Sequence, residues 1–237
     1  MLPDKKISVI LPTYNEKENV LSLIPLIDNE LGEYNHEIIV VDDNSPDGTF
    51  GSVLDKSFPC AKVICRKENK GLAYSIRCGL ENASGDIFIV MDSDFNHPPE
   101  YLLFLIQSLS FCDCVSASRF MRNHQNAPLR HRLSFLFNIF VRFMTGSRVR
   151  DHLYGFFAVK KEALEKCPYD DIFWGFGDYY IRLLYYLQKN KVSILEIPAV
   201  SGERKNGRGN RSFLKVFLQY TKETLYLSRK GRIDSYV

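Results

Sequence analysis

Two aspartates one residue apart, Asp92 and Asp94, directly follow an apolar segment of the chain. That segment, Ile87 to Met91, begins shortly after Gly85 and ends in charge, which is typical of a strand buried on both faces. Because residues i and i+2 of an extended chain point the same way, the two carboxylates can converge on one point, where they repel each other unless a cation or proton lies between them. Such oxygen ligands suit Mg²⁺ or Mn²⁺, and Asn96 adds a third oxygen to this predicted metal site. The triplet taken alone is also consistent with a solvated acidic turn.

The elements that would position this site alternate between strand-like and helical segments, as judged from apolar runs and apolar periodicity. Strands are predicted at residues 7–11, 37–41, 61–65, 87–91, 115–118, 156–159 and 192–197. Helices are predicted at residues 16–31, 72–82, 99–109, 130–144, 178–190 and 213–229. Asn15 is the expected N-cap of the first helix, and Pro99 is expected to open the third. The alternation predicts an α/β fold with a mostly parallel sheet covered by helices on both faces.

Ligands of such sheets bind beyond the carboxyl ends of the strands, so the site is expected where the first, second and fourth strands end. Tyr14 and Glu16 follow the first strand, Asp43 follows the second, and Asp92 and Asp94 follow the fourth. An aromatic face suits stacking on a nucleobase, and a carboxylate can accept hydrogen bonds from a base or a ribose. The glycine signatures of dinucleotide folds and of P-loops are absent. Each turn also has a purely structural explanation, but together they favour a nucleotide and metal site.

Three segments resemble family 2 glycosyltransferases: residues 9–16, residues 40–49, and the Asp92-x-Asp94 block with residues 97–100. Within that family the chain most resembles dolichol-phosphate mannose synthases and their bacterial polyprenyl-phosphate counterparts, from about Ile7 to about Gly209. The resemblance implies a GT-A fold, with a mostly parallel Rossmann-like central sheet, and a nucleotide diphosphate sugar donor. Residues 1–211 would form the catalytic domain, and residues 212–237 a basic amphipathic tail without a transmembrane span.

The resemblance also assigns residues to the donor side of the site. Those at the nucleoside and beside the diphosphate would be Pro12, Tyr14, Glu16, Val41, Asp43, Met91 and Ser93. Asp92 and Asp94 would hold the metal, Mg²⁺ or Mn²⁺, that bridges the diphosphate. The family often has Gln where this chain has Asn96. Asn is one methylene shorter, so a water-bridged role for Asn96 is an alternative to direct ligation.

On the acceptor side, three arginines match phosphate-binding positions of the family. Arg119 follows the fifth strand, Arg130 lies four residues before Ser134, and Arg204 resembles the arginine of an Arg-x-x-Gly loop. Planar guanidinium groups suit the phosphate of a polyprenyl phosphate acceptor because they can donate two parallel hydrogen bonds to it. A lone arginine is otherwise most often a solvated surface residue.

Two apolar helical segments with basic flanks predict contact with a membrane surface. Residues 133–144 are apolar almost all round but too short to span a bilayer, and residues 213–232 show a similar mixture. A core helix is one explanation of the first segment, and a helix in the headgroup region is the other. Some relatives carry transmembrane helices after the second of these segments, where this sequence stops. A small membrane-anchoring protein is therefore a further expected partner.

The resemblance predicts an inverting, metal-dependent transfer of a hexose, mannose from GDP-mannose, to a dolichyl-type polyprenyl phosphate. A phosphate acceptor is already anionic at neutral pH, since its second pKa is about 6, and needs no general base. Tyr154 would take the hydroxyl position of the family's Asp-x-x-Ser/Thr-Gly-Phe motif, which begins here at Asp151. The alternatives are transfer to a sugar hydroxyl with Asp178 as base, UDP-glucose as donor, or a non-catalytic nucleotide-sugar sensor.

Composition agrees with a globular enzyme that does not bind nucleic acid. The chain has 237 residues, 45% hydrophobic and 25% charged, with a net charge of +3. The six cysteines show no paired zinc or redox spacing, so they are expected to be free thiols in a reducing compartment. Residues 1–6 lack the apolar region of a signal peptide. The expected location is the cytosol, peripheral to the cytosolic face of a membrane: the endoplasmic reticulum in a eukaryote, the plasma membrane in a prokaryote.

Overall fold

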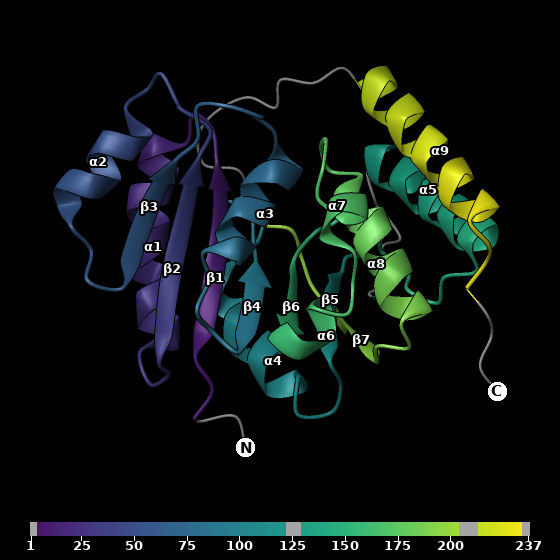
Figure 1. Cartoon of the computed structure of the whole chain (residues 1–237), viewed down its shortest axis with the longest axis horizontal. Coiled ribbons are helices and arrows are strands. Elements are labelled where there is room, and N and C mark those ends of the chain that lie inside the picture. The colour runs from purple at the N-terminus through teal and green to yellow at the C-terminus, as the bar shows by residue number, and fades with distance from the viewer. Residues whose placement is uncertain (1–3, 122–128, 204–212, 234–237) are drawn as a thin grey trace.

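A seven-stranded sheet with strand order β3-β2-β1-β4-β6-β5-β7 forms the centre of the computed structural model, which describes residues 4–121, 129–203 and 213–233 (Figure 1). The strands are β1 (Ile7–Thr13), β2 (His36–Asp42), β3 (Ala61–Cys65), β4 (Ile87–Val90), β5 (Cys114–Ser118), β6 (Phe157–Lys160) and β7 (Ile194–Pro198). The main helices are α1 (Lys17–Leu31), α2 (Thr49–Lys56), α3 (Leu72–Glu81), α4 (Leu102–Ser108), α5 (Leu129–Thr145), α8 (Tyr179–Lys189) and α9 (Phe213–Arg229). Shorter turns are η1 (Pro99–Tyr101), α6 (Lys161–Leu164) and α7 (Tyr169–Ile172).

The sheet is buried on both faces because successive residues of its strands enter different cores. Val9 and Leu11 of β1 pack in a cluster with α1 and α4, whereas Ile10 packs in a second cluster with α3 and α8. In β4, Ile89 belongs to the first cluster and Phe88 to the second. This burial explains why the strands read as continuous apolar runs, and it confirms the predicted α/β layering.

One strand, β6, runs against its neighbours. It pairs antiparallel with both β4 and β5, while β1, β2, β3 and β4 pair in parallel and β5 pairs in parallel with β7. A reversed strand brings the residues that precede it to the edge where its parallel neighbours end. The segment from Asp151 to Phe156 therefore lies at the same edge as the residues that follow β4 and β5.

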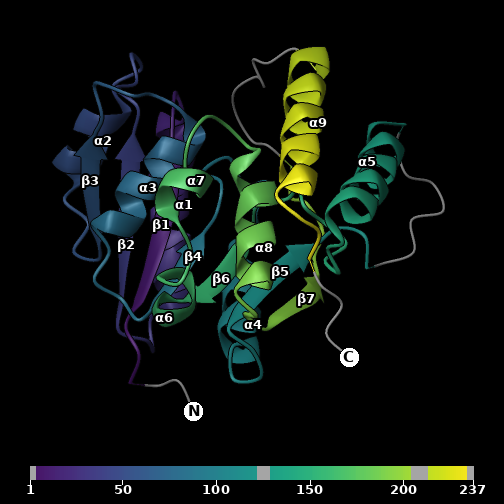
Figure 2. The same ribbon diagram turned by 45° about the vertical axis from the view of Figure 1, so that its right-hand side comes forward.

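Helices α5 and α9 lie side by side at the end of the molecule remote from α2 (Figures 1 and 2). Their inner faces meet α8 in a third apolar cluster that includes Phe137, Val141, Ile181 and Leu227. Among the residues that the structure describes, no helix is both long and apolar enough to cross a bilayer.

The seven predicted strands and six predicted helices are all present, with small shifts at their ends. The predicted N-cap was wrong: Asn15 has a left-handed backbone with φ 56°, and α1 begins at Lys17 after Glu16 without a side-chain cap. The 3₁₀ turn η1, which leads directly into α4, does begin at Pro99, as expected from the lack of an N–H group there. Helices α2, α6 and α7 were not predicted.

Candidate active site

The turn after β4 holds the two aspartates at the carboxyl edge of the sheet. Between them, Ser93 is buried, and its hydroxyl donates to the backbone carbonyl of Pro12 at 3.1 Å. This bond ties the turn to β1. The side chain of Asp92 is 39% exposed, and that of Asp94 is half-buried. Asp94 Oδ1 accepts the backbone N–H of Asn96 at 3.0 Å.

A buried histidine fixes the backbone of Asp92. The backbone N–H of Asp92 donates to Nδ1 of His97 at 2.8 Å, so Nδ1 is the unprotonated ring nitrogen. The proton is then on Nε2, which donates to the carbonyl of Tyr154 at 2.9 Å. Burial lowers the pKa of His97 to about 4, which keeps this tautomer neutral at physiological pH. The ring also stacks on Phe156, with 4.8 Å between ring centroids.

Asp43, which directly follows β2, is almost fully buried and binds the segment that runs from the end of β3 into α3. Its Oδ1 accepts hydrogen bonds from the guanidinium of Arg66 at 2.7 Å and the hydroxyl of Ser75 at 2.6 Å. Its Oδ2 accepts the backbone N–H of Gly71 at 2.7 Å. A carboxylate offers about four acceptor positions, so these three bonds leave capacity for one ligand donor.

The loop after β1 presents an aromatic ring. Tyr14 is 53% exposed, whereas Glu16 is buried and accepts a hydrogen bond from the amide of Asn19. The loop after β2 holds this segment in place, because Asp47 accepts the backbone N–H of Lys17 at 3.1 Å and that of Thr49 at 3.0 Å. The aromatic face of Tyr14 is therefore accessible to a ligand, while the Glu16 carboxylate bonds to a neighbouring side chain, that of Asn19.

At the end of β5, Arg119 is held by a buried carboxylate. Asp151 is fully buried and accepts the Nε–H of Arg119 at 2.8 Å and an Nη2–H at 2.9 Å. The guanidinium carbon also lies 5.0 Å from the ring centroid of Tyr154. The segment that precedes β6 thus sets the plane of the guanidinium. The side chain of Arg119 is 21% exposed.

Tyr154 joins this arginine to the aspartate turn. Its hydroxyl donates to the carbonyl of Asn96 at 3.0 Å, and the same carbonyl accepts the N–H of Gly202 at 3.0 Å. A Cβ atom at Gly202 would lie 2.1 Å from the carbonyl oxygen of Phe95, so only glycine fits there. Phe95 itself has a left-handed backbone, with φ 70°. Two other segments, at Tyr154 and at Gly202, therefore hold the backbone after Asp94.

The remaining predicted site residues are placed less directly. Val41 and Met91 are fully buried, so their side chains support the rim from beneath rather than line it. Arg130 is exposed in the first turn of α5. That turn lies near Arg119, because Phe120 contacts the ring of His131 at 4.7 Å between centroids. Arg204 lies outside the described residues.

Asp178, the alternative base, is fully buried and ion-paired. Its Oδ2 accepts an N–H of Arg182 at 2.9 Å, and its Oδ1 accepts the backbone N–H of Phe176 at 3.1 Å. Arg182 is also buried and lies 3.4 Å from Glu223 of α9. Asp178 stands at the start of α8, and its side chain makes no capping hydrogen bond with that helix.

The residues that support the site were not predicted from the sequence. His97 and Asp151 occur inside matched motifs, but their roles depend on Tyr154 and Arg119, which are distant in the chain. Arg66 carried no signal beyond being a charged residue after the third strand. Together the rim offers two partly exposed carboxylates, an exposed aromatic ring and an anchored guanidinium. These groups suit a ligand with a base, a metal-bound diphosphate and a second phosphate.

Residues 8–167 match the model of the family described as glycosyl transferase family 2. Dolichol-phosphate mannosyltransferase of Pyrococcus furiosus is 37% identical over 98% of this chain, which spans 66% of that protein. Polyprenol monophosphomannose synthase of Mycolicibacterium smegmatis is 31% identical over 86% of this chain and 80% of its own length. Dolichol-phosphate mannosyltransferase of Saccharomyces cerevisiae is 31% identical over 94% of this chain and 88% of its own length.

Solved structures of glucosyl-3-phosphoglycerate synthase from Mycobacterium tuberculosis have a similar fold. The complex with Mn²⁺, uridine diphosphate and phosphoglyceric acid has a TM-score of 0.72 and 21% identity, covering 99% of this chain and 81% of that one. The complex with Mg²⁺ and uridine diphosphate has a TM-score of 0.70 and 21% identity, covering 99% and 82%. At this identity the likeness concerns the fold alone.

Proposed function

Because the chain belongs to glycosyl transferase family 2 and has the GT-A fold, we propose that it transfers mannose from GDP-mannose to a dolichyl-type polyprenyl phosphate with inversion. The names of the three relatives support both the sugar and the lipid phosphate. The observation that carries the proposal is the pairing of the Asp92–Asp94 turn with Arg119 at one rim, through Tyr154. A carboxylate pair and a cation beside each other match a donor diphosphate and an acceptor phosphate.

On the donor side, Tyr14 would stack on the nucleobase, and Asp43 would accept one hydrogen bond from the nucleoside. Pro12, Glu16, Val41, Met91 and Ser93 shape this part of the rim from beneath. The carboxylates of Asp92 and Asp94 fit Mg²⁺ or Mn²⁺, because both are partly exposed oxygen donors on one tightly fixed turn. Asn96 would bind the ion directly or through water. When bound, such an ion neutralises the charge that develops on the leaving diphosphate.

On the acceptor side, Arg119 would orient the phosphate, assisted by Arg130 and Arg204. One phosphate oxygen attacks the anomeric carbon from the face opposite the diphosphate, so a new C–O bond forms as the bond to the diphosphate oxygen breaks. The nucleophile is already anionic, and no proton has to be removed. The burial of Asp178 and its pairing with Arg182 support this acceptor over a sugar hydroxyl, because that reaction needs an accessible base.

The lipid tail would lie against the membrane beside α5 and α9, at the cytosolic face. These helices carry exposed apolar side chains: Leu129, Leu133, Phe135, Leu136, Ile139 and Phe143 on α5, and Leu214, Phe217, Leu218, Leu225 and Tyr226 on α9. Exposed basic residues accompany them: Arg130, Arg132, Arg142, Lys215, Lys222 and Arg229. An apolar surface with basic neighbours suits the headgroup region. Residues 1–211 would then be the catalytic domain, and residues 212–237 a docking tail that works alone or with a small anchoring protein.

The test is transfer of labelled sugar into an organic phase, with purified protein, Mg²⁺ or Mn²⁺, several nucleotide sugars, and dolichyl or undecaprenyl phosphate. GDP-mannose is expected to be the best donor, and a preference for UDP-glucose would refute that part of the proposal. Asp92→Ala and Asp94→Ala should each abolish turnover while the circular dichroism spectrum is retained. A folded, fully active Asp94→Ala protein would refute the metal assignment. Arg119→Ala should raise the KM for the lipid phosphate more than that for the donor, and equal effects would refute its role.

A further inference from the structure

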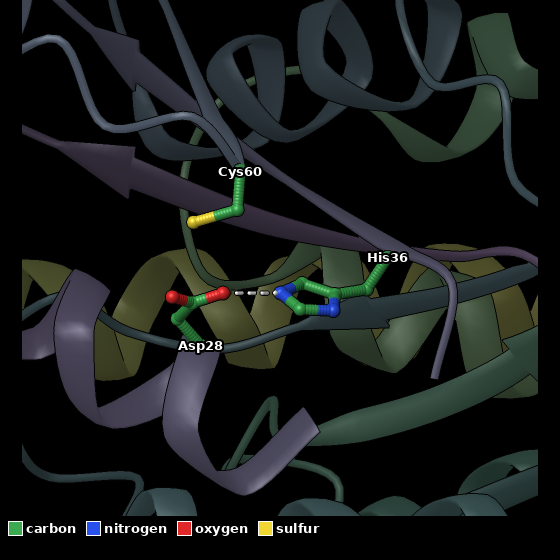
Figure 3. A group of neighbouring side chains, drawn as sticks. All are labelled: Asp28, His36 and Cys60. Atoms are coloured by element: carbon green, nitrogen blue, oxygen red, sulfur yellow. Dashed lines mark hydrogen bonds and ion pairs between the residues drawn. The ribbon is translucent and has the colours of Figure 1, made fainter. Parts of the chain in front are cut away.

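Three side chains with metal-binding chemistry meet at the edge of the sheet opposite the active site (Figure 3). Asp28 belongs to α1, His36 is the first residue of β2, and Cys60 directly precedes β3. One ligand atom from each of them lies within 4.8 Å of the others. Among the residues described, they are the one group of three or more His, Cys, Asp or Glu side chains that meets so closely.

His36 is already oriented as a metal ligand would be. Its Nδ1 lies 2.9 Å from the carbonyl oxygen of Tyr34, which can only accept, so Nδ1 carries a proton. Its Nε2 points at Asp28 Oδ1, 3.0 Å away, and the side chain is 8% exposed. Metal-bound histidines usually donate their second ring N–H to a carbonyl or carboxylate, which fixes the ring and directs the other nitrogen to the ion. The Tyr34 carbonyl has that position here.

The mixed donor set indicates which ion would bind. One sulfur, one nitrogen and one oxygen are borderline donors that suit Zn²⁺, with bonds of about 2.0–2.3 Å. Ligand atoms of a tetrahedral site with such bonds lie about 3.3–3.8 Å apart. His36 Nε2 and Asp28 Oδ1, 3.0 Å apart, already have about this spacing, and no two of the three ligand atoms lie more than 4.8 Å apart, so small side-chain movements would bring the sulfur of Cys60 to the same ion. A water molecule would complete the coordination.

We propose that Asp28, His36 and Cys60 form a zinc site that clamps α1 to the starts of β2 and β3. The site is separate from the proposed catalytic metal, because β2 spans seven residues, or about 20 Å, between His36 and the rim. It also differs in chemistry, since the Asp92–Asp94 turn offers only oxygen donors. Zinc here would stabilise the donor-binding half of the fold without taking part in transfer.

Co²⁺ titration of the reduced, metal-stripped full-length protein tests the proposal, in excess Mg²⁺ to fill oxygen-ligand sites. One equivalent of Co²⁺ should produce a thiolate-to-cobalt charge-transfer band, and Zn²⁺ should abolish it by displacement. The band should be absent in Cys60→Ser and retained in the matched control Cys65→Ser, which alters the half-buried thiol at the other end of β3. Asp28→Asn, at an exposed position, should weaken Co²⁺ binding at least about tenfold without unfolding the protein.

Thermal unfolding gives a second measurement. Zn²⁺ should raise the Tm of the wild type and of Asp92→Ala, but not that of Cys60→Ser, because only an ion bound to the folded state stabilises it. If the wild type gives no charge-transfer band, or Cys60→Ser gives the same band, the proposal is overturned. In that case the contact between His36 and Asp28 is only a side-chain hydrogen bond, and Cys60 is a neighbouring thiol.

Discussion

The histidine behind the aspartate turn offers the sharpest test of how the site is built. His97 accepts the N–H of Asp92 and donates to the carbonyl of Tyr154 from two different ring nitrogens. The amide oxygen of Asn can replace Nδ1, and the amide nitrogen of Gln can replace Nε2, because each has the matching number of bonds from Cβ. His97→Asn should therefore keep the bond to Asp92, and His97→Gln should keep the bond to Tyr154.

The magnitudes follow from which partners lose their bonds. His97→Phe leaves the buried carbonyl of Tyr154 and the part-buried N–H of Asp92 without partners, which costs about 2–4 kcal/mol of unfolding free energy in total. Each amide variant loses one bond and should cost about half as much. If Asp92 holds the metal as proposed, turnover depends on this bond, so His97→Gln and His97→Phe should lose about 10–100-fold in apparent metal affinity or rate. His97→Asn, which keeps the bond to Asp92, should lose less of its metal affinity and rate.

Urea denaturation measures the stability of the four proteins, and initial rates at varied Mn²⁺ measure the metal affinity. The two amide variants should have similar stability but different activity. If His97→Gln is the more active of the two, or if His97→Phe matches the wild type in both measurements, the inferred tautomer and its role are refuted.

Three further predictions concern the surroundings of the site. Burial lowers the pKa values of His97 and His152 to about 4, below the unfolded value of about 6.5, so the unfolded chain takes up protons first. Urea denaturation should therefore show full stability above pH 6.5 and a loss of about 3 kcal/mol per histidine as the pH falls towards 4, and a flat profile would contradict this. Asp178→Asn should cost about 3–5 kcal/mol because it leaves the buried Arg182 without its nearest carboxylate, yet the folded fraction should keep its turnover in the transfer assay. Loss of that turnover would instead support Asp178 as a base. Gly202→Ala should displace the turn at Phe95 and lower apparent metal affinity, whereas Gly51→Ala, which meets no atom within 4 Å, should not.

Much of the sheet could be predicted because each strand is an apolar run of its own. The residues at the rim followed from the rule that ligands bind beyond the carboxyl ends of strands. The direction of β6 could not be predicted, because an apolar run has no sign that distinguishes parallel from antiparallel pairing. Helix α2 buries only Thr49 and Val53, so its apolar pattern was too weak to separate it from the preceding turn.

The supporting contacts of the site could not be predicted for a different reason. His97 bonds with Tyr154, 57 positions away, and Asp43 bonds with Arg66, 23 positions away. Neither pair has a spacing that indicates a contact, and each becomes visible only when the strands are placed side by side. The same holds for Asp28, His36 and Cys60, which come from three separate segments of the chain and match no metal-binding motif.

The reversed strand has a consequence for the order of folding. Strands β1 to β4 pair with one another through parallel units that are complete within the first 90 residues. The other edge of β4 is covered only by β6, where Ile87 pairs with Lys160. During synthesis the half of the sheet formed by β1 to β4 can therefore form while Tyr154 is still missing, because N-terminal units emerge first and long-range pairing is slow. The aspartate turn would gain its full set of bonds only when most of the chain has left the ribosome, so catalytic competence would be among the last properties that the nascent protein acquires.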